Sequence, residues 1–173
     1  GIWHAFNGYW AGIDPKSKVG EKYKNELVPY MDKVAWTNEP IDTFYFMNPK
    51  GENSFKFYDD WYTYLKNEGI SFVKVDNQLI MDRIARNNLA FSQTAENLQN
   101  NLSKAVKKHF NGNIINCMDM TTDAVYNFGD SPIARASEDF FPENNTYNIH
   151  AGNAAIHVLC NLYNSLWWGQ MVY

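Results

Sequence analysis

Short apolar runs alternate with helix-like patterns along most of this 173-residue chain, and this alternation constrains its fold more than any other feature. The runs have the length of strands, and the segments between them are loops or carry apolar residues at helical spacing. Strands that alternate with helices pair in parallel through crossover connections. The sequence therefore predicts an α/β protein, either an open doubly wound sheet or an arc of a (β/α) barrel. The predicted strands are residues 1–6, 70–75, 114–118, 132–136 and 170–173.

The clearest predicted helix carries one apolar stripe and is followed by Gly112, a residue typical of helix C-termini. Its stripe consists of Ala95, Leu98, Leu102, Ala105 and Val106. An earlier helix is expected to end or kink at Pro29. Besides the striped segment, the predicted helices are 21–34, 55–68 and 148–166, and the predicted loops are 7–20 and 36–54.

The charge balance argues against nucleic acid as a partner. Lys plus Arg number 15 and Asp plus Glu 19, which gives a net charge of −4 in place of a basic face. No run of about 18 apolar residues is present, so no membrane span is expected. The two cysteines, Cys117 and Cys160, lie outside any CxxC motif, which favours roles in the core. The compartment stays open, since unpaired cysteines fit a cytoplasmic location only loosely.

Motifs for several common chemistries are missing. Neither a glycine-rich phosphate loop nor GxSxG occurs, which argues against a nucleotide-binding protein and a nucleophile elbow. The four histidines, His4, His109, His150 and His157, form no compact ligand set with the cysteines, so no metal site is expected. Aromatic residues make up 16% of the chain. Composition leaves open whether they fill a core or form platforms for sugar rings.

Two pairs of a carboxylate and a cation follow predicted strands, at the sheet edge where α/β proteins place their chemistry. Lys74 and Asp76 are two residues apart and share a strand face. A neighbouring cation lowers the pKa of Asp76 and keeps it ionised, as a nucleophile must be. Arg135 is placed to hold a sugar hydroxyl or a carboxylate near Asp139. Each pair alone is more typical of a structural ion pair at a barrel rim.

Two carboxylates at one end of a parallel sheet are what retaining glycosidases need, with carboxyl groups about 5–5.5 Å apart. Side chains that lean towards a barrel axis can reach this separation from strands two apart. This chemistry needs no metal or organic cofactor.

Three separated motifs resemble family 36 of the glycoside hydrolases, and within it the branch of raffinose synthases, seed imbibition proteins and related microbial α-galactosidases. They occur in the expected order, and the resemblance covers nearly the whole chain. The motifs are Gly1-Ile2-Trp3-His4-Ala5-Phe6-Asn7-Gly8-Tyr9-Trp10, Phe72-Val73-Lys74-Val75-Asp76-Asn77-Gln78 and Arg135-Ala136-Ser137-Glu138-Asp139-Phe140-Phe141-Pro142.

The resemblance implies a (β/α)₈ TIM-barrel glycosidase, with residues 1–173 as a partial catalytic barrel domain that supplies roughly the third to seventh strands. Asp76 would be the nucleophile that forms a covalent galactosyl intermediate, and Asp139 the general acid/base. Glu138 competes for the second role, but the four-residue spacing from Arg135 favours Asp139. The residues implied in substrate binding are Lys74, Arg135, Trp3, His4, Cys117 and Asp119, and for the last four a structural role is as good an interpretation.

The implied function is hydrolysis of terminal α-galactosides, such as raffinose-type oligosaccharides, by double displacement with retention. Galactosyl transfer of the raffinose synthase type and α-N-acetylgalactosaminidase activity are alternatives within the same mechanism. A non-catalytic carbohydrate-binding fragment is a third, and it predicts sugar binding that survives replacement of both carboxylates by Ala. The expected partner in each case is an α-galactoside oligosaccharide or a related sugar.

Members of the resembled family are several times longer than this chain. Their first two barrel strands, last strand and flanking β-sandwich regions have no counterpart here. We therefore expect a fragment of a larger catalytic domain, whose activity in isolation stays open. Apolar barrel edges, where exposed, would favour oligomers.

Overall fold

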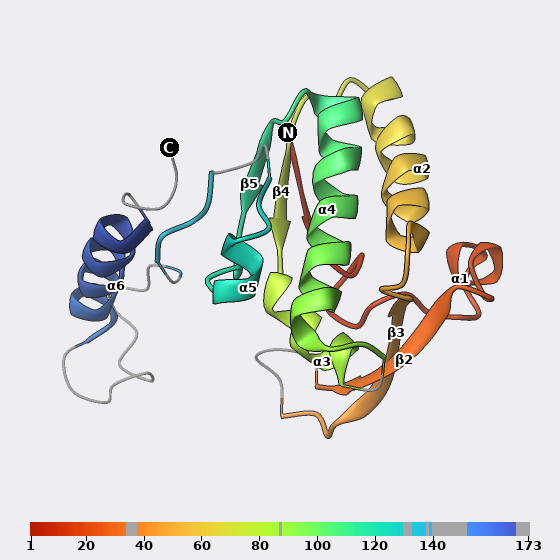
Figure 1. Ribbon diagram of the computed structural model, residues 1–173, viewed down its shortest axis with the longest axis horizontal. Helices are drawn as coiled ribbons and strands as arrows, with labels where there is room; N and C mark the ends of the chain where they lie inside the picture. The colour runs from red at the N-terminus through yellow and green to blue at the C-terminus, as the bar shows by residue number, and fades with distance from the viewer. Residues whose placement is uncertain (34–37, 87, 130–132, 138, 140–151, 169–173) are drawn as a thin grey trace. The chain divides into compact units, whose positions relative to one another are not determined.

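A three-stranded parallel sheet forms the centre of the first of two compact units in the computed structural model of the protein (Figure 1). Its strands are β1 (Ile2–Ala5), β4 (Val73–Asp76) and β5 (Ile114–Asn116), hydrogen-bonded in the order β1-β4-β5. Both pairings are parallel, and the three strands lie in the sheet in the order in which they occur in the chain. The mixed α/β architecture and three predicted strands are confirmed.

The structure describes residues 1–33, 38–86, 88–129, 133–137, 139 and 152–168. In the last of these segments the side chains are described from Ala155 onwards. The two units comprise residues 1–133 and 134–173, and each is described by itself. Among the described residues, no helix combines the length and apolar character that a bilayer crossing needs.

Two long helices connect the three strands and pack against each other. They are α2 (Asn53–Asn67) and α4 (Phe91–Phe110), and the ring of Tyr62 lies 5.0 Å from that of Phe110. The apolar stripe predicted for α4 is buried along its whole length. Gly69 and Gly112 follow the two helices at positive φ, as predicted. Between β4 and α4 the chain forms the 3₁₀ turn η1 (Gln78–Ile80) and the short helix α3 (Met81–Ala85).

An antiparallel hairpin interrupts the alternation between β1 and α2. After α1 (Lys18–Lys22), β2 (Leu27–Asp32) pairs with β3 (Asp42–Met47). The prediction of a helix over 21–34 is therefore wrong, and so is the prediction of a loop where β3 lies.

Burial explains why this segment is a hairpin although it contains Pro29. Tyr30 and Phe46 are at most 1% exposed, and the Phe46 ring lies 6.0 Å from that of Phe6. Pro29 is opposite Tyr45, whose carbonyl accepts a hydrogen bond from the Ile13 N–H instead of from β2. The pairing of Pro29 with Tyr45 therefore requires no backbone N–H donor from β2. Proline, which lacks this donor, is tolerated at such a position.

Gly12 brings the loop after β1 against the hairpin. Its φ is +72°, and a Cβ atom there would lie 2.4 Å from the Tyr45 carbonyl oxygen and 2.8 Å from the Tyr30 hydroxyl oxygen. Only glycine allows both this conformation and this approach. The predicted loop 7–20 therefore packs directly against β3.

The chain beyond β5 agrees with the predictions in part. After α5 (Thr122–Val125), the Ile133 carbonyl accepts from the Asn116 N–H at 2.9 Å. Of the predicted strand 132–136, residues 133–136 are described, and they hold one bridge residue, Ala134. In the second unit, α6 (Gly152–Trp168) confirms the described part of the helix predicted over 148–166. The predicted strand 170–173 lies outside the described residues.

Candidate active site

Asp76 ends β4 and points to the sheet face opposite the two long helices. In the parallel register, Trp3 is paired with Lys74, and His4 with Val75. His4 and Val75 are buried on the helix side, while Trp3 is 37% exposed. Because side chains alternate along a strand, Trp3, Lys74 and Asp76 share the other face. The Lys74 ammonium lies 4.0 Å from the Asp76 carboxylate, as the two-residue spacing predicts.

Several donors surround the Asp76 carboxylate. The Trp3 indole N–H donates to Oδ2 at 3.0 Å, and the backbone N–H of Asn77 donates to Oδ1 at 2.8 Å. The Cys117 side chain adds a further hydrogen bond. Burial by itself raises the pKa of Asp76, but these donors and Lys74 together hold it below its ordinary value. The carboxylate is therefore ionised at neutral pH.

A chain of buried amides fixes the backbone beside this carboxylate. Asn77 has φ +58°, the left-handed conformation, and its backbone N–H donates to Asp76 Oδ1. Its side-chain amide donates to Asn7 Oδ1 at 3.1 Å, and the Asn7 amide donates to the Tyr30 hydroxyl at 2.7 Å. Asp76 is thus linked through two asparagines to the β2–β3 hairpin.

A second buried chain lies under the same strand end. The Gln78 amide donates to the Val75 carbonyl at 3.1 Å and to Asn116 Oδ1 at 2.9 Å. Gln99 of α4 donates to Gln78 Oε1 at 2.5 Å. Asn77 and Gln78 belong to the second of the three sequence motifs, but the sequence alone assigns them no role. The signal was available, because polar residues that directly follow a buried strand must find partners.

Trp3 is also part of an aromatic group on the open face. Its ring lies 6.4 Å from that of Tyr9, edge to face, and 5.8 Å from that of Trp10. A partly exposed indole whose N–H is held by the Asp76 carboxylate presents a flat apolar surface next to an anion. A flat apolar surface of this kind suits the C–H face of a sugar ring.

His4 lies on the opposite face, away from Asp76. It is 3% exposed, and its ring nitrogens contact the Ala5 carbonyl and the Tyr62 hydroxyl, each at 2.9 Å. Burial lowers its pKa to about 4, so the imidazole is neutral. The structure favours a core role for His4 over the predicted role in lining a substrate pocket.

The remaining predicted residues of the first unit follow β5. Cys117 is fully buried and its side chain is hydrogen-bonded to Asp76. Asp119, two residues later, is also fully buried. His109 contacts Asp59 at 2.6 Å, away from this site. In the part of the chain that the structure describes, no group of three or more His, Cys, Asp or Glu residues is arranged to hold a metal ion.

The second predicted pair belongs to the second unit. Arg135 and Asp139 form an ion pair through Nη1 and Oδ1, and the Asp139 side chain is 57% exposed. This contact is the ion pair that the sequence analysis gives as the alternative to a substrate-binding role, and the role of Arg135 towards a sugar stays a prediction. Glu138 and His150 lie outside the described residues. Because the units are described separately, the pairing of Asp76 with Asp139 stays a prediction.

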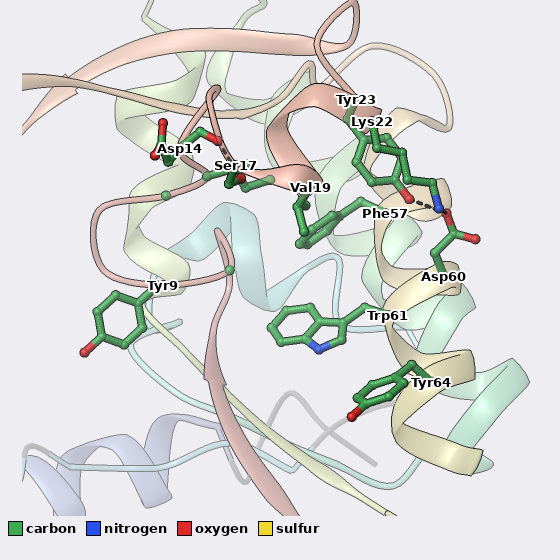
Figure 2. A pocket seen from close by; sticks show the side chains of 13 residues that line it. Tyr9, Asp14, Ser17, Val19, Lys22, Tyr23, Phe57, Asp60, Trp61 and Tyr64 are labelled. Atoms are coloured by element: carbon green, nitrogen blue, oxygen red, sulfur yellow. Dashed lines mark hydrogen bonds and ion pairs between the residues drawn. The ribbon is translucent and has the colours of Figure 1, made fainter. Parts of the chain in front are cut away.

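Among the cavities lined by the described residues of the first unit, two have a volume of about 440 Å³ each. The first is lined by the loop after β1, by α1 and by α2, and Figure 2 shows Trp61 and Tyr64 projecting from α2 beside it. Lys22 pairs with Asp60 at 2.6 Å at one end of this cavity. The second lies at the carboxyl ends of β4 and β5 and includes Asn77 in its wall.

Comparison with known proteins agrees with the three motifs. The family model for raffinose synthase or seed imbibition protein Sip1 matches residues 1–173. The chain is 28% identical to probable galactinol–sucrose galactosyltransferase 1 of Arabidopsis thaliana, over 99% of this chain and 23% of that protein. It is 27% identical to stachyose synthase of Pisum sativum, over 99% of this chain and 21% of that protein. The galactinol–sucrose galactosyltransferase of Pisum sativum is also 27% identical, over 99% of this chain and 23% of its own length.

The chain thus spans less than a quarter of the length of these curated relatives. The match nevertheless runs from the first residue to the last, through the Asp76 motif and the Arg135 motif alike. The chain belongs to the raffinose synthase or seed imbibition protein family.

Proposed function

We propose that the protein carrying this chain transfers α-galactosyl groups from one sugar to another through a covalent intermediate on Asp76. The observation that carries the proposal is the environment of Asp76, an ionised carboxylate at the end of a parallel strand, held by Trp3, Asn77 and Cys117. Relatives named as galactinol–sucrose galactosyltransferases and stachyose synthase support transfer over the hydrolysis expected from the motifs alone.

The proposed fold is a (β/α)₈ barrel, with residues 1–173 as part of its catalytic domain. Parallel strands in the order β1-β4-β5, each followed by helical segments, support this arrangement. In a barrel, catalytic groups lie at the carboxyl ends of the strands, where Asp76 is found.

The proposed reaction has two displacements. In the first, an Asp76 oxygen attacks the anomeric carbon, the bond to the leaving-group oxygen breaks, and Asp139 gives that oxygen a proton. In the second, a hydroxyl oxygen of the acceptor sugar attacks the same carbon, its proton passes to Asp139, and the ester bond to Asp76 breaks. Two inversions retain the α configuration. Lys74, Arg135 and the Trp3 ring would bind the galactosyl group, and Cys117 and Asp119 would support the pocket from β5.

Hydrolysis is the second candidate, since water can replace the acceptor hydroxyl in the second displacement. The resemblance of the Asp76 and Arg135 motifs to those of microbial α-galactosidases favours it. The two functions differ only in what reaches the intermediate, and their products separate them.

The test supplies galactinol and sucrose to the protein that carries this chain and measures galactosylated sucrose and free galactose. Asp76→Ala should abolish both products, whereas Asp42→Asn, a change at an exposed carboxylate of β3, should leave them unchanged. Azide should rescue Asp76→Ala and yield a β-galactosyl azide, because a small nucleophile would replace the missing carboxylate on its own face. Normal turnover by Asp76→Ala would exclude the proposal. An aryl α-N-acetylgalactosaminide as donor tests the other sugar specificity in the same way.

A further inference from the structure

The second cavity begins one residue beyond Asp76. It is formed by the hairpin end of β2, by the segment from Asn77 through α3, and by the loop after β5. Asn77 belongs to its wall and also donates its backbone N–H to Asp76 Oδ1. Asn77 thus links the wall of this cavity to the carboxylate that would carry the galactosyl group.

One wall of the cavity carries a guanidinium held by two carboxylates. Arg83 Nη1 lies 2.5 Å from Asp82 Oδ2, and Arg83 Nε lies 3.8 Å from Asp32 Oδ1. Asp32 comes from the hairpin and Asp82 from α3, so the charge is fixed between two separate elements. About a third of the Arg83 side chain stays exposed. A guanidinium fixed in this way keeps donors for a ligand, and the carboxylates beside it can accept from hydroxyl groups.

Apolar side chains complete the cavity. Leu79, Phe91 and Met118 belong to its wall, and Leu79 is 44% exposed. A cavity of about 440 Å³ that combines apolar walls with a few charged groups is in the size range of sites for ligands as large as a disaccharide. Hydroxylated sugar rings match this mixture, because they present C–H faces between hydroxyl groups that donate and accept.

We propose that this cavity is the subsite for the acceptor sugar, with Arg83 as the residue that binds its hydroxyl groups. The proposal rests on the galactosyl transfer proposed above and adds where the acceptor sits. The galactosyl group itself must lie on the open face with Trp3 and Lys74, which do not line the cavity. The cavity lies beyond the carboxyl ends of β4 and β5, and the acceptor would extend from it to the face of the anomeric carbon opposite Asp76.

The occupied cavity would decide between transfer and hydrolysis. When the acceptor is bound, its hydroxyl oxygen forms the new bond to the anomeric carbon as the ester bond to Asp76 breaks, and the hydroxyl proton leaves to the general base. When the cavity is empty, water takes the same place and free galactose results. The ratio of the two products therefore reports on the cavity and not on formation of the intermediate.

The experiment gives a nitrophenyl α-galactoside as donor and sucrose as acceptor to the protein that carries this chain. It measures the ratio of galactosylated sucrose to free galactose, with nitrophenol release recorded in parallel. Arg83→Ala should lower the ratio about tenfold or more, the effect expected for the loss of one charge-assisted hydrogen bond. Leu79→Trp, which fills the cavity without removing a charge, should lower it as well. The matched control is Arg86→Ala, because Arg86 also pairs with Asp82, at 3.2 Å, but lies outside the cavity wall, and its ratio should not change.

An unchanged ratio in Arg83→Ala and Leu79→Trp would overturn the acceptor subsite while leaving galactosyl transfer in place. An equal fall in Arg86→Ala would overturn it too, since the effect would then come from charge near α3 and not from the cavity. Nitrophenol release that does not depend on Asp76 would instead exclude the proposed function, and the acceptor assignment would fall with it.

Discussion

The two carboxylates predicted to be catalytic have very different surroundings. Asp76 is 7% exposed and receives hydrogen bonds from an indole, a backbone amide and a second side chain. Asp139 belongs to the other unit, its side chain is 57% exposed, and it pairs with Arg135 four residues earlier. The ionised state of Asp76 is a local property of three adjacent strands and the turn after β4. Among the described residues, by contrast, Asp139 is held by the ion pair with Arg135 of its own segment.

The largest expected effect comes from Asp76→Ala. A missing nucleophile blocks the first displacement whatever the leaving group is, so transfer should fall at least a thousandfold with galactinol and with a nitrophenyl galactoside. Steady-state rates with both donors measure this. A loss that is large for one donor and small for the other would assign Asp76 a different role and break the contrast between the carboxylates.

Asp139→Ala should lower the steady-state rate about 10²- to 10⁴-fold with galactinol, the range typical of a lost general acid/base. With a nitrophenyl donor the first displacement needs little protonation, so a burst of nitrophenol should precede slow turnover. Rapid-mixing measurement of nitrophenol detects the burst. Equal losses for the two donors would mean that Asp139 does not protonate the leaving group.

Trp3→Phe keeps an aromatic ring but removes the N–H that donates to Asp76. Because that hydrogen bond favours the ionised carboxylate, its loss raises the pKa of Asp76 and moves the acidic limb of kcat/KM to higher pH. The pH profile of the variant measures the shift. Trp10→Phe is the control, since its ring contacts Trp3 and the structure gives it no bond to Asp76. An unmoved limb in Trp3→Phe would show that the indole donor does not set the charge of Asp76.

The smallest effect is expected from Tyr30→Phe. It removes the hydroxyl that accepts from the Asn7 amide and leaves that buried amide without this partner, at a cost of about 1 kcal/mol in the free energy of unfolding. Urea denaturation against Tyr126→Phe, a change at an exposed tyrosine, measures it. A variant as stable as the control would mean that the hairpin does not support the asparagines beside Asp76.

Much of the frame around Asp76 could be predicted from the sequence. The striped helix, the helix over 55–68 and the buried strand ending in Asp76 follow from apolar spacing, which is strong where one face is buried and the other is not. The position of Lys74 beside Asp76 follows from the two-residue period of strands.

The hairpin could not be predicted in this way. Pro29 and scattered polar residues mask the strand pattern in β2 and β3, and the pairing that stabilises them is between segments. The same holds for the amide chain from Tyr30 to Asn77, since hydrogen bonds across 70 and 23 residues leave no local spacing to detect. For His4 the sequence leaves both a pocket role and a structural role open, because position at a strand end does not tell which face a side chain takes.

Gly12 gives a practical marker for other members of this family. Any side chain at this position would collide with the Tyr45 carbonyl and the Tyr30 hydroxyl. A relative with another residue here must therefore pack its hairpin differently or lack the hairpin. The residue at this position in an aligned sequence would then separate relatives that share this packing of the hairpin from those that hold Asn7 and Asn77 by other contacts. Such a sorting requires no further structure, and it would identify which relatives are proper templates for the Asp76 site.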